Sequence, residues 1–159
     1  MATTRTRYQP TLNAGFVLAQ FAFIALCLWG VVAEIFHGIP WWQYLFAIPL
    51  VLSSFYIGLW ALWSMGSDTF SVLPAPVPEG TLCAHGPYRW VRHPMYTAVI
   101  GICFAAVILD PTVLRAVAFL FLIWVLVEKL SYEEMLLRRS YASYKAYAKT
   151  RKRLLPGIW

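Results

Sequence analysis

Charged side chains are scarce in this chain. Asp, Glu, Lys and Arg make up 13% of its 159 residues, whereas hydrophobic residues make up 60%. A typical soluble domain is about 25% charged, so this composition excludes an ordinary water-soluble domain. The apolar excess falls into four long runs, which predict an all-α integral membrane protein with little mass outside the bilayer.

The chain also lacks the spacings of a metal site or a redox site. Its three cysteines form no paired motif, and Cys27 and Cys103 lie inside apolar runs, which is typical of small buried hydrophobes. A metal site built from Cys83, His85 and His93 would have unconvincing spacing, so we expect no metal. No strand is followed by a Gly-rich turn and a helix, which excludes the α/β nucleotide-binding folds.

The four apolar runs predict four transmembrane helices. The first is too long for the core of a signal peptide, and further spans follow it. The last two should form a helical hairpin with a minimal turn at Asp110–Thr112, because Pro111 and Thr112 suit a helix start. We place the spans at about residues 14–36, 41–63, 93–109 and 112–129.

Positive charge marks one side of the membrane. Twelve of the 13 Lys and Arg residues lie at the termini, in the loop after the second span, or at the inner end of the fourth. Both termini and that loop should therefore face the cytoplasm. Arg115 falls near the opposite surface, where we expect it to snorkel outward. No soluble recognition module accompanies the basic tail, so nucleic acid is not expected as a partner.

We interpret residues 1–159 as one domain, with a two-span part at 1–64 and a catalytic, ligand-binding part at 65–159. Beyond the fourth span, Leu137, Tyr141 and Tyr144 fall on one helical face. This pattern predicts a cytoplasmic amphipathic helix that continues from that span.

Residues 85–96 concentrate two Arg, two His, two Pro and two Tyr at the boundary between the polar loop and the third span. A simple interfacial anchor of Arg and aromatic residues would require neither this order nor the two prolines. Arg89 is open to two interpretations, a topology-setting, phosphate-binding residue or a site residue. We interpret the segment as part of a functional site.

This segment and two later acids offer complementary chemistry. Arg89, Arg92 and His93 supply donors. Tyr88, Trp90 and Tyr96 supply flat apolar surfaces, and Glu133 and Glu134 supply acceptors. Together they suit a ligand with an anionic end, an aromatic ring and a positive centre. S-adenosylmethionine has all three.

Gly86–Tyr96, with the sequence Gly-Pro-Tyr-Arg-Trp-Val-Arg-His-Pro-Met-Tyr, closely resembles the signature of the isoprenylcysteine carboxyl methyltransferase family. Membrane phospholipid N-methyltransferases share a related pattern. The resemblance extends upstream through 79–82 and downstream to the acid pair, 144–147 and 153–156. It implies a multi-pass enzyme that binds S-adenosylmethionine on the cytosolic side, beneath a helical hairpin, and methylates a lipophilic acceptor from the bilayer.

The resemblance also implies roles for individual residues. We expect catalytic roles for Arg92, Glu133, Glu134 and Arg153. We expect cofactor contacts from His85, Gly86, Pro87, Tyr88, His93, Tyr96 and Tyr144. The chain departs from the family at Ala98, where Gly is frequent, and at Ser140-Tyr141, where Phe-Gly is frequent. The acid pair also lies one residue closer to Tyr144 than usual, which leaves open which Glu has the family's role.

The acceptor could be anionic or an amine. Arg92 or Arg153 could hold a carboxylate or thiolate, and Glu133 or Glu134 could take the proton of an amine. Because cations outnumber acids around the segment, the sequence favours an isoprenylcysteine-type carboxylate or a thiol. A phospholipid amine is the alternative, and a non-enzymatic, lipid-binding membrane subunit is the competing class. The sequence does not define the oligomeric state.

Overall fold

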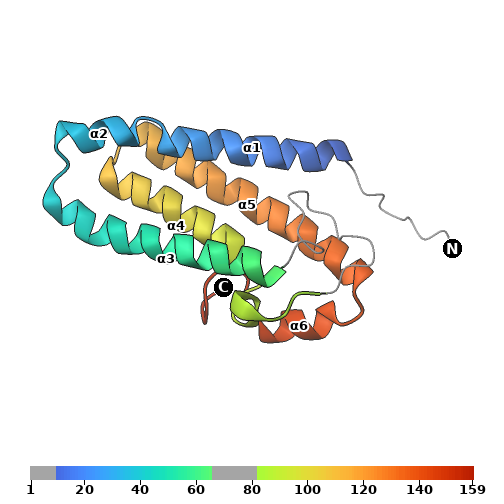
Figure 1. Ribbon diagram of the computed structural model, residues 1–159. Coiled ribbons are helices and arrows are strands. Elements are labelled where there is room, and N and C mark those ends of the chain that lie inside the picture. The colour runs from blue at the N-terminus through green and yellow to red at the C-terminus, as the bar shows by residue number, and fades with distance from the viewer. Residues whose placement is uncertain (1–9, 66–81) are drawn as a thin grey trace.

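The computed structural model describes residues 10–65 and 82–159, and these residues are helical, with one isolated bridge and no strand. The predicted all-α fold is confirmed for this part of the chain (Figure 1). The loop after the second span and the block 79–82 fall mainly on residues 66–81, outside the described residues. The helices are α1 Pro10–Leu28, α2 Val31–His37, α3 Trp41–Met65, η1 Gly86–Arg89 (a 3₁₀ turn), α4 Pro94–Leu109, α5 Val113–Ser140 and α6 Tyr144–Thr150.

The long helices pack as two pairs that share one bundle. Helix α1 lies along α5, α3 lies along α4, and α4 also contacts both α1 and α5 (Figure 1). The expected hairpin is present as α4 and α5, joined by residues 110–112. A small apolar core lies between them, formed by Cys27, Cys103, Ala118, Leu122 and Leu126.

Most of the bundle's outer surface is apolar, as a lipid-facing protein requires. Phe55, Leu59 and Trp63 on α3, for example, are all exposed. Two segments, Asn13–His37 and Trp41–Met65, are long and apolar enough to cross a membrane. Helix α4 has only 16 residues, and α5 carries charges within its apolar part. The protein is therefore membrane-associated, and the count of four spans stays a prediction.

The first predicted span is long and apolar enough to cross a membrane over Asn13–His37, but its helix is interrupted. Helix α1 ends at Leu28, Gly30 adopts a left-handed φ of 75°, and α2 begins at Val31. Glycine adopts this left-handed backbone conformation at little cost in free energy, because it has no Cβ. The break frees carbonyl groups at the end of α1, and these need new donors.

Arg115 supplies those donors, so the prediction that it snorkels outward was wrong. Its side chain is buried and donates to the carbonyls of Cys27 at 2.8 Å and Trp29 at 2.7 Å. It also pairs with the carboxylate of Asp110 in the α4–α5 turn. Arg115 thus joins the end of α1 to the hairpin.

The predicted continuous C-terminal helix is interrupted. Helix α5 ends at Ser140, Tyr141 is extended with φ −119° and ψ 114°, and α6 begins at Tyr144. Leu137 and Tyr144 therefore lie on different helices. The turn folds α6 back beneath the bundle, close to η1 (Figure 1).

Close backbone approach fixes the α3–α4 pair. A Cβ on Gly101 of α4 would clash with the hydroxyl of Ser54 and lie 3.2 Å from its Cβ. A Cβ on Gly58 of α3 would lie 3.3 Å from the Cβ of Ala98. Small residues at these positions allow the two helices to pack closely.

Candidate active site

The site begins with a tight turn that only glycine permits. Gly86 has a φ of 58°, and a Cβ there would clash with the hydroxyl of Ser64 on α3. Pro87 then opens the 3₁₀ turn η1, where its missing N–H costs nothing. Pro87 and Tyr88 are buried against the bundle, which fixes the direction of the chain before α4.

The C-terminal tail runs beside the same segment. The N–H groups of Arg92 and His93 donate to the carbonyls of Lys152 and Arg153, at 2.8 Å and 3.0 Å. The Thr97 hydroxyl donates to the Leu154 carbonyl at 2.7 Å. These bonds bring Arg153 to the start of α4, 60 positions upstream in the chain.

Helix α6 closes the site from below. The hydroxyl of Tyr147 donates to the carbonyl of Tyr88 at 2.7 Å, and Tyr144 is almost fully buried. Burial raises the pKa of Tyr144 to about 12, with the charge of Glu134 adding to the rise and Arg92 opposing it. Tyr144 is therefore a neutral phenol that can donate a hydrogen bond.

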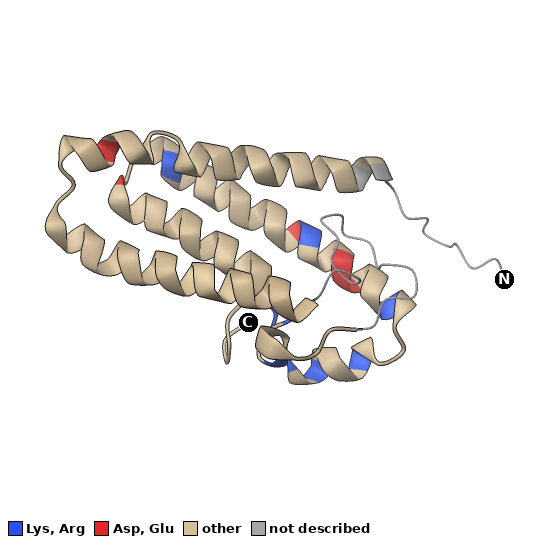
Figure 2. Ribbon diagram, viewed as in Figure 1, with Lys and Arg blue, Asp and Glu red and all other residues tan. Residues whose placement is uncertain are grey.

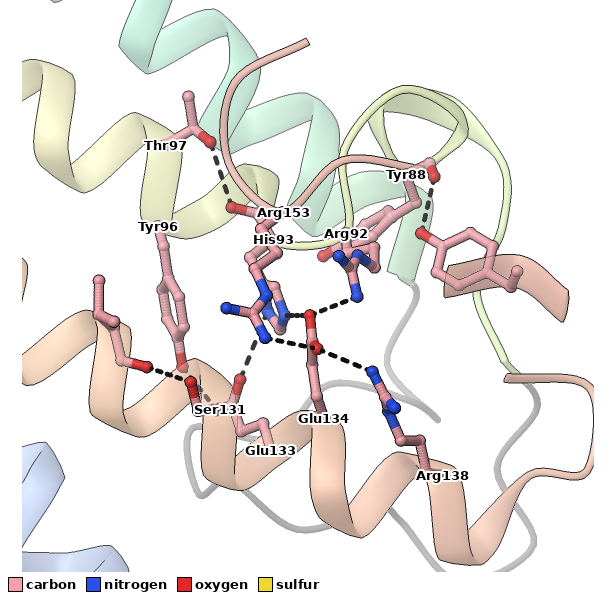
Figure 3. Close-up of polar contacts among 12 residues, drawn as sticks. Tyr88, Arg92, His93, Tyr96, Thr97, Ser131, Glu133, Glu134, Arg138 and Arg153 are labelled. Atoms are coloured by element: carbon pink, nitrogen blue, oxygen red, sulfur yellow. Dashed lines mark hydrogen bonds and ion pairs between the residues drawn. The ribbon is translucent and has the colours of Figure 1, made fainter. Parts of the chain in front are cut away.

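Glu134 is the charged centre of the site (Figure 3). One oxygen, Oε1, lies 2.7 Å from Arg92 Nη1 and 3.4 Å from His93 Nε2. The other oxygen, Oε2, lies 3.5 Å from Arg153 Nη2 and 3.6 Å from Arg138 Nη2. Four side chains from three parts of the chain thus converge on one buried carboxylate.

These partners decide the charge of Glu134. Burial alone would raise its pKa, but the contact with His93 and the positive charges of Arg92 and Arg153 outweigh burial. The pKa of Glu134 is therefore below its ordinary value, and the side chain is an anion at neutral pH.

Glu133 lies beside Glu134 in a different environment. Its Oε1 accepts a hydrogen bond from the Tyr96 hydroxyl at 2.5 Å, and its Oε2 lies 3.6 Å from His93 Nδ1. The rings of His93 and Tyr96 stack at 5.5 Å with an interplanar angle of 6°. In the described part of the chain, Glu133 has no Arg or Lys within ion-pair distance. The two acids are thus chemically distinct.

A cleft of about 540 Å³ opens beside this cluster. Its lining comes from α5, α6 and the tail: Ser131, Glu134, Met135, Arg138, Arg139, Lys145 and Arg153. Four buried polar atoms of the cluster have no hydrogen-bond partner among the described residues: Arg92 Nε, His93 Nε2, Glu134 Oε1 and Tyr144 OH. Arg92 Nη1 and His93 Nε2 lie close to Glu134 Oε1, but neither has the alignment of a hydrogen bond with it. Unsatisfied buried donors and acceptors in one place are typical of a ligand site.

The structure brings together most of the residues expected from the sequence, but two lie apart. His85 is exposed, and its Nδ1 lies 3.8 Å from the Cys83 sulfur. Arg89 is exposed, with its guanidinium 5.4 Å from the Trp90 ring centroid. Within residues 10–65 and 82–159, no three His, Cys, Asp or Glu side chains form a group that could hold a metal.

Sequence reasoning missed one polar pair. Lys129 was interpreted as a topology charge at the end of a span, yet it is buried and donates to Gln20 Oε1 of α1 at 2.8 Å. The available signal was that Gln20 interrupts an otherwise apolar run.

The fold and the site describe a helical membrane protein with a charged, ligand-sized site at one end. A family model described as phospholipid methyltransferase matches residues 42–144, more than half of the chain. The chain therefore belongs to the phospholipid methyltransferase family, and this membership implies methyltransferase activity in a membrane. No curated protein and no solved structure matches the chain. Helices α1 and α2 and most of α6 lie outside the matched residues.

Proposed function

We propose that this protein transfers a methyl group from S-adenosylmethionine to the amine of a membrane lipid. The observation that carries the proposal is the difference between the two acids. Glu134 is neutralised by Arg92, Arg138 and Arg153, whereas Glu133 contacts only Tyr96 and His93 in the site. A carboxyl group that no Arg or Lys of the described residues pairs with suits a positively charged amine.

The cluster has groups that fit the cofactor. The unpartnered atoms of Arg92 and Tyr144 would donate to the carboxylate of S-adenosylmethionine, and Glu134 Oε1 would accept from its amine. When bound, the cofactor supplies a reactive methyl group on a sulfonium. Methyl transfer of this kind requires mainly alignment and the exclusion of water. The buried cluster can align the cofactor, and the packing of α6 and the C-terminal tail around the site helps to exclude water.

Glu133 has the catalytic role in this proposal. A lipid amine resembles a lysine, with a pKa near 10, so only about one molecule in a thousand is unprotonated at pH 7. Glu133 takes the proton that the amine must lose, and the Tyr96 hydroxyl holds Glu133 in place. Arg92 and Arg153, which the sequence assigned to an anionic acceptor, both face Glu134 instead.

The pH profile of a charge-neutral variant tests this role. Phosphatidylethanolamine in lipid nanodiscs and methyl-labelled cofactor are given to the wild type and to Glu133→Gln. Without its base, the variant depends on pre-existing free amine, so its rate should rise about tenfold per pH unit between pH 6 and 9. The wild type should be faster and flatter. Glu128→Gln, on the exposed face of the same helix, is the matched control and should behave as the wild type. Parallel pH profiles in all three proteins would remove Glu133 from proton transfer.

Carboxyl methylation of an isoprenylcysteine-type acceptor is the second candidate. The resemblance of Gly86–Tyr96 to that family's signature favours it. The product separates the two candidates, because a methyl ester releases its label as methanol in mild base and a methylated amine does not.

We also propose that the site and both termini face the cytoplasm. Basic residues gather at the end of the bundle that carries α6, as the positive-inside rule requires (Figure 2). Cys83 lies at this end and is partly exposed, whereas Cys27 and Cys103 are buried. Burial raises the pKa of the Cys83 thiol, so labelling should be performed near pH 8.5. A membrane-impermeant reagent should label Cys83 in inverted vesicles and not in intact cells; labelling in intact cells would reverse the orientation.

A further inference from the structure

A buried lysine lies one turn below the acid pair. Lys129 of α5 is 3% exposed, and its ammonium donates to Gln20 Oε1 at 2.8 Å. It also lies 5.2 Å from the centroid of the Tyr96 ring, whose hydroxyl binds Glu133. Three helices, α1, α4 and α5, therefore surround this ammonium group.

Lys129 and Glu133 form no ion pair, although they are four residues apart on one helix. Neither shares an ion pair with the other in the described part of the chain, and each is held by a neutral group: Gln20 for Lys129, and the Tyr96 hydroxyl for Glu133. Ionisable groups within membrane helices usually pair or mark a ligand path. Two opposite charges held apart, each by a neutral partner, are complementary to a zwitterion.

We propose that Lys129 binds the phosphate of a zwitterionic lipid headgroup whose amine faces Glu133. This inference rests on the function proposed above and adds the residue that selects phospholipids from other amines. Four residues correspond to about 6 Å along a helix, a span suited to two groups joined by a two-carbon link. Lys129 also lies toward the apolar middle of α5. In a phospholipid the phosphate lies between the acyl chains and the amine. The order of phosphate and amine from the apolar side therefore matches the order of Lys129 and Glu133 along α5.

Gln20 has a defined part in this arrangement. Its amide oxygen accepts a hydrogen bond from the ammonium of Lys129, which has three N–H donors. A phosphate oxygen would accept in the same way. A neutral amide is a weaker partner for an ammonium than an anionic oxygen is. The headgroup would therefore displace Gln20. The alternative is a purely structural role, in which the hydrogen bond between Lys129 and Gln20 only joins α5 to α1.

Substrate selectivity distinguishes these two roles. Methylation of phosphatidylethanolamine and of a long-chain alkylamine, which has no phosphate, is compared in the same nanodiscs with saturating cofactor. The wild type should prefer the phospholipid. Lys129→Met should lower the ratio of the two kcat/KM values by roughly 10- to 100-fold, the effect expected for loss of a charged hydrogen bond. Lys129→Arg should keep most of the preference. Gln20→Met, which breaks the tie but leaves the ammonium, should keep the preference.

A second readout requires no cofactor. Native mass spectrometry of the purified protein should show retention of phosphatidylethanolamine over the alkylamine by the wild type and by Gln20→Met. If Lys129→Met does not fold, lipid retention is measured on Lys129→Arg instead. This variant should retain phosphatidylethanolamine over the alkylamine, as the wild type does. A wild type without phospholipid preference would overturn the inference, as would equal losses on both substrates in Lys129→Met and Gln20→Met. A wild type that methylates neither amine would instead overturn the proposed function, while the retention measurement would still judge Lys129.

Discussion

Neutralising Glu134 should destabilise the whole site, because four partners depend on this one carboxylate. Glu134→Gln keeps the shape of the side chain but removes its charge. Arg92, with a side chain only 11% exposed, would then lack its counter-ion. Loss of one member of a buried ion pair costs about 3–5 kcal/mol, whereas a half-exposed pair such as Arg138–Glu134 contributes about 0–1 kcal/mol. The pair with Arg92 therefore dominates the expected loss.

Thermal unfolding in detergent measures this effect. At about 2–4 °C per kcal/mol, the apparent Tm of Glu134→Gln should fall by roughly 6–20 °C. Glu128→Gln is the matched control, because Glu128 is exposed on the same helix. Its Tm should change by no more than about 2 °C. Equal Tm shifts in the two variants would show that the buried charge of Glu134 does not stabilise the site.

The pH dependence of the Tm provides a second test of the role of Glu134. Because the folded pKa of Glu134 is below its ordinary value of 4.5, this carboxylate stabilises the fold fully above about pH 4.5. That contribution is lost as the pH falls through the folded pKa. The Tm difference between wild type and Glu134→Gln should therefore shrink below pH 4.5, and a difference that grows with acid would contradict the assigned sign.

Three further predictions concern separate contacts. Tyr96→Phe removes the 2.5 Å bond to Glu133 but keeps the ring, so kcat should fall roughly 10- to 100-fold in the methyl-transfer assay with little change in Tm. Arg115→Met leaves the Trp29 carbonyl and the other groups freed at the α1–α2 break without a donor, and should lower the free energy of unfolding by about 3–5 kcal/mol in denaturant titrations. Gly101→Ala clashes with the Ser54 hydroxyl and should cost about 1–3 kcal/mol in the same titrations. The double variant with Ser54→Ala should recover part of that loss; no recovery would place the strain elsewhere.

The sequence predicted the parts of this fold that local patterns control. Apolar runs placed the long helices, and the third span, expected at about residues 93–109, is α4, Pro94–Leu109. His93 and Tyr96 lie three positions apart at the start of the third span, a spacing that favours a shared face, and the structure has their rings stacked. The pairing of this face with Glu133 and Glu134 was also expected, although on the resemblance to a known family.

Contacts between distant positions were beyond local patterns. The break at Gly30 is stable because Arg115 binds the freed carbonyls, and the two positions are far apart in the chain. Lys129 and Gln20 are separated by 109 positions, and each alone is typical of an end-of-span charge or a tolerated polar residue. The difference between the two acids also depends on tertiary contacts, because Arg92 and Arg153 of the tail pair with Glu134 and not with Glu133. Tertiary packing, rather than local propensity, decides all three.

The chemistry of the methylated product shows whether the acceptor is a lipid amine. Purified protein in nanodiscs that contain phosphatidylethanolamine is incubated with methyl-labelled S-adenosylmethionine, and the extracted lipid is treated with mild base. We expect label that is stable to base and that migrates with N-methylated ethanolamine headgroups. Label released as methanol would show that the acceptor is a carboxylate and would contradict the assignment of Glu133 to a lipid amine.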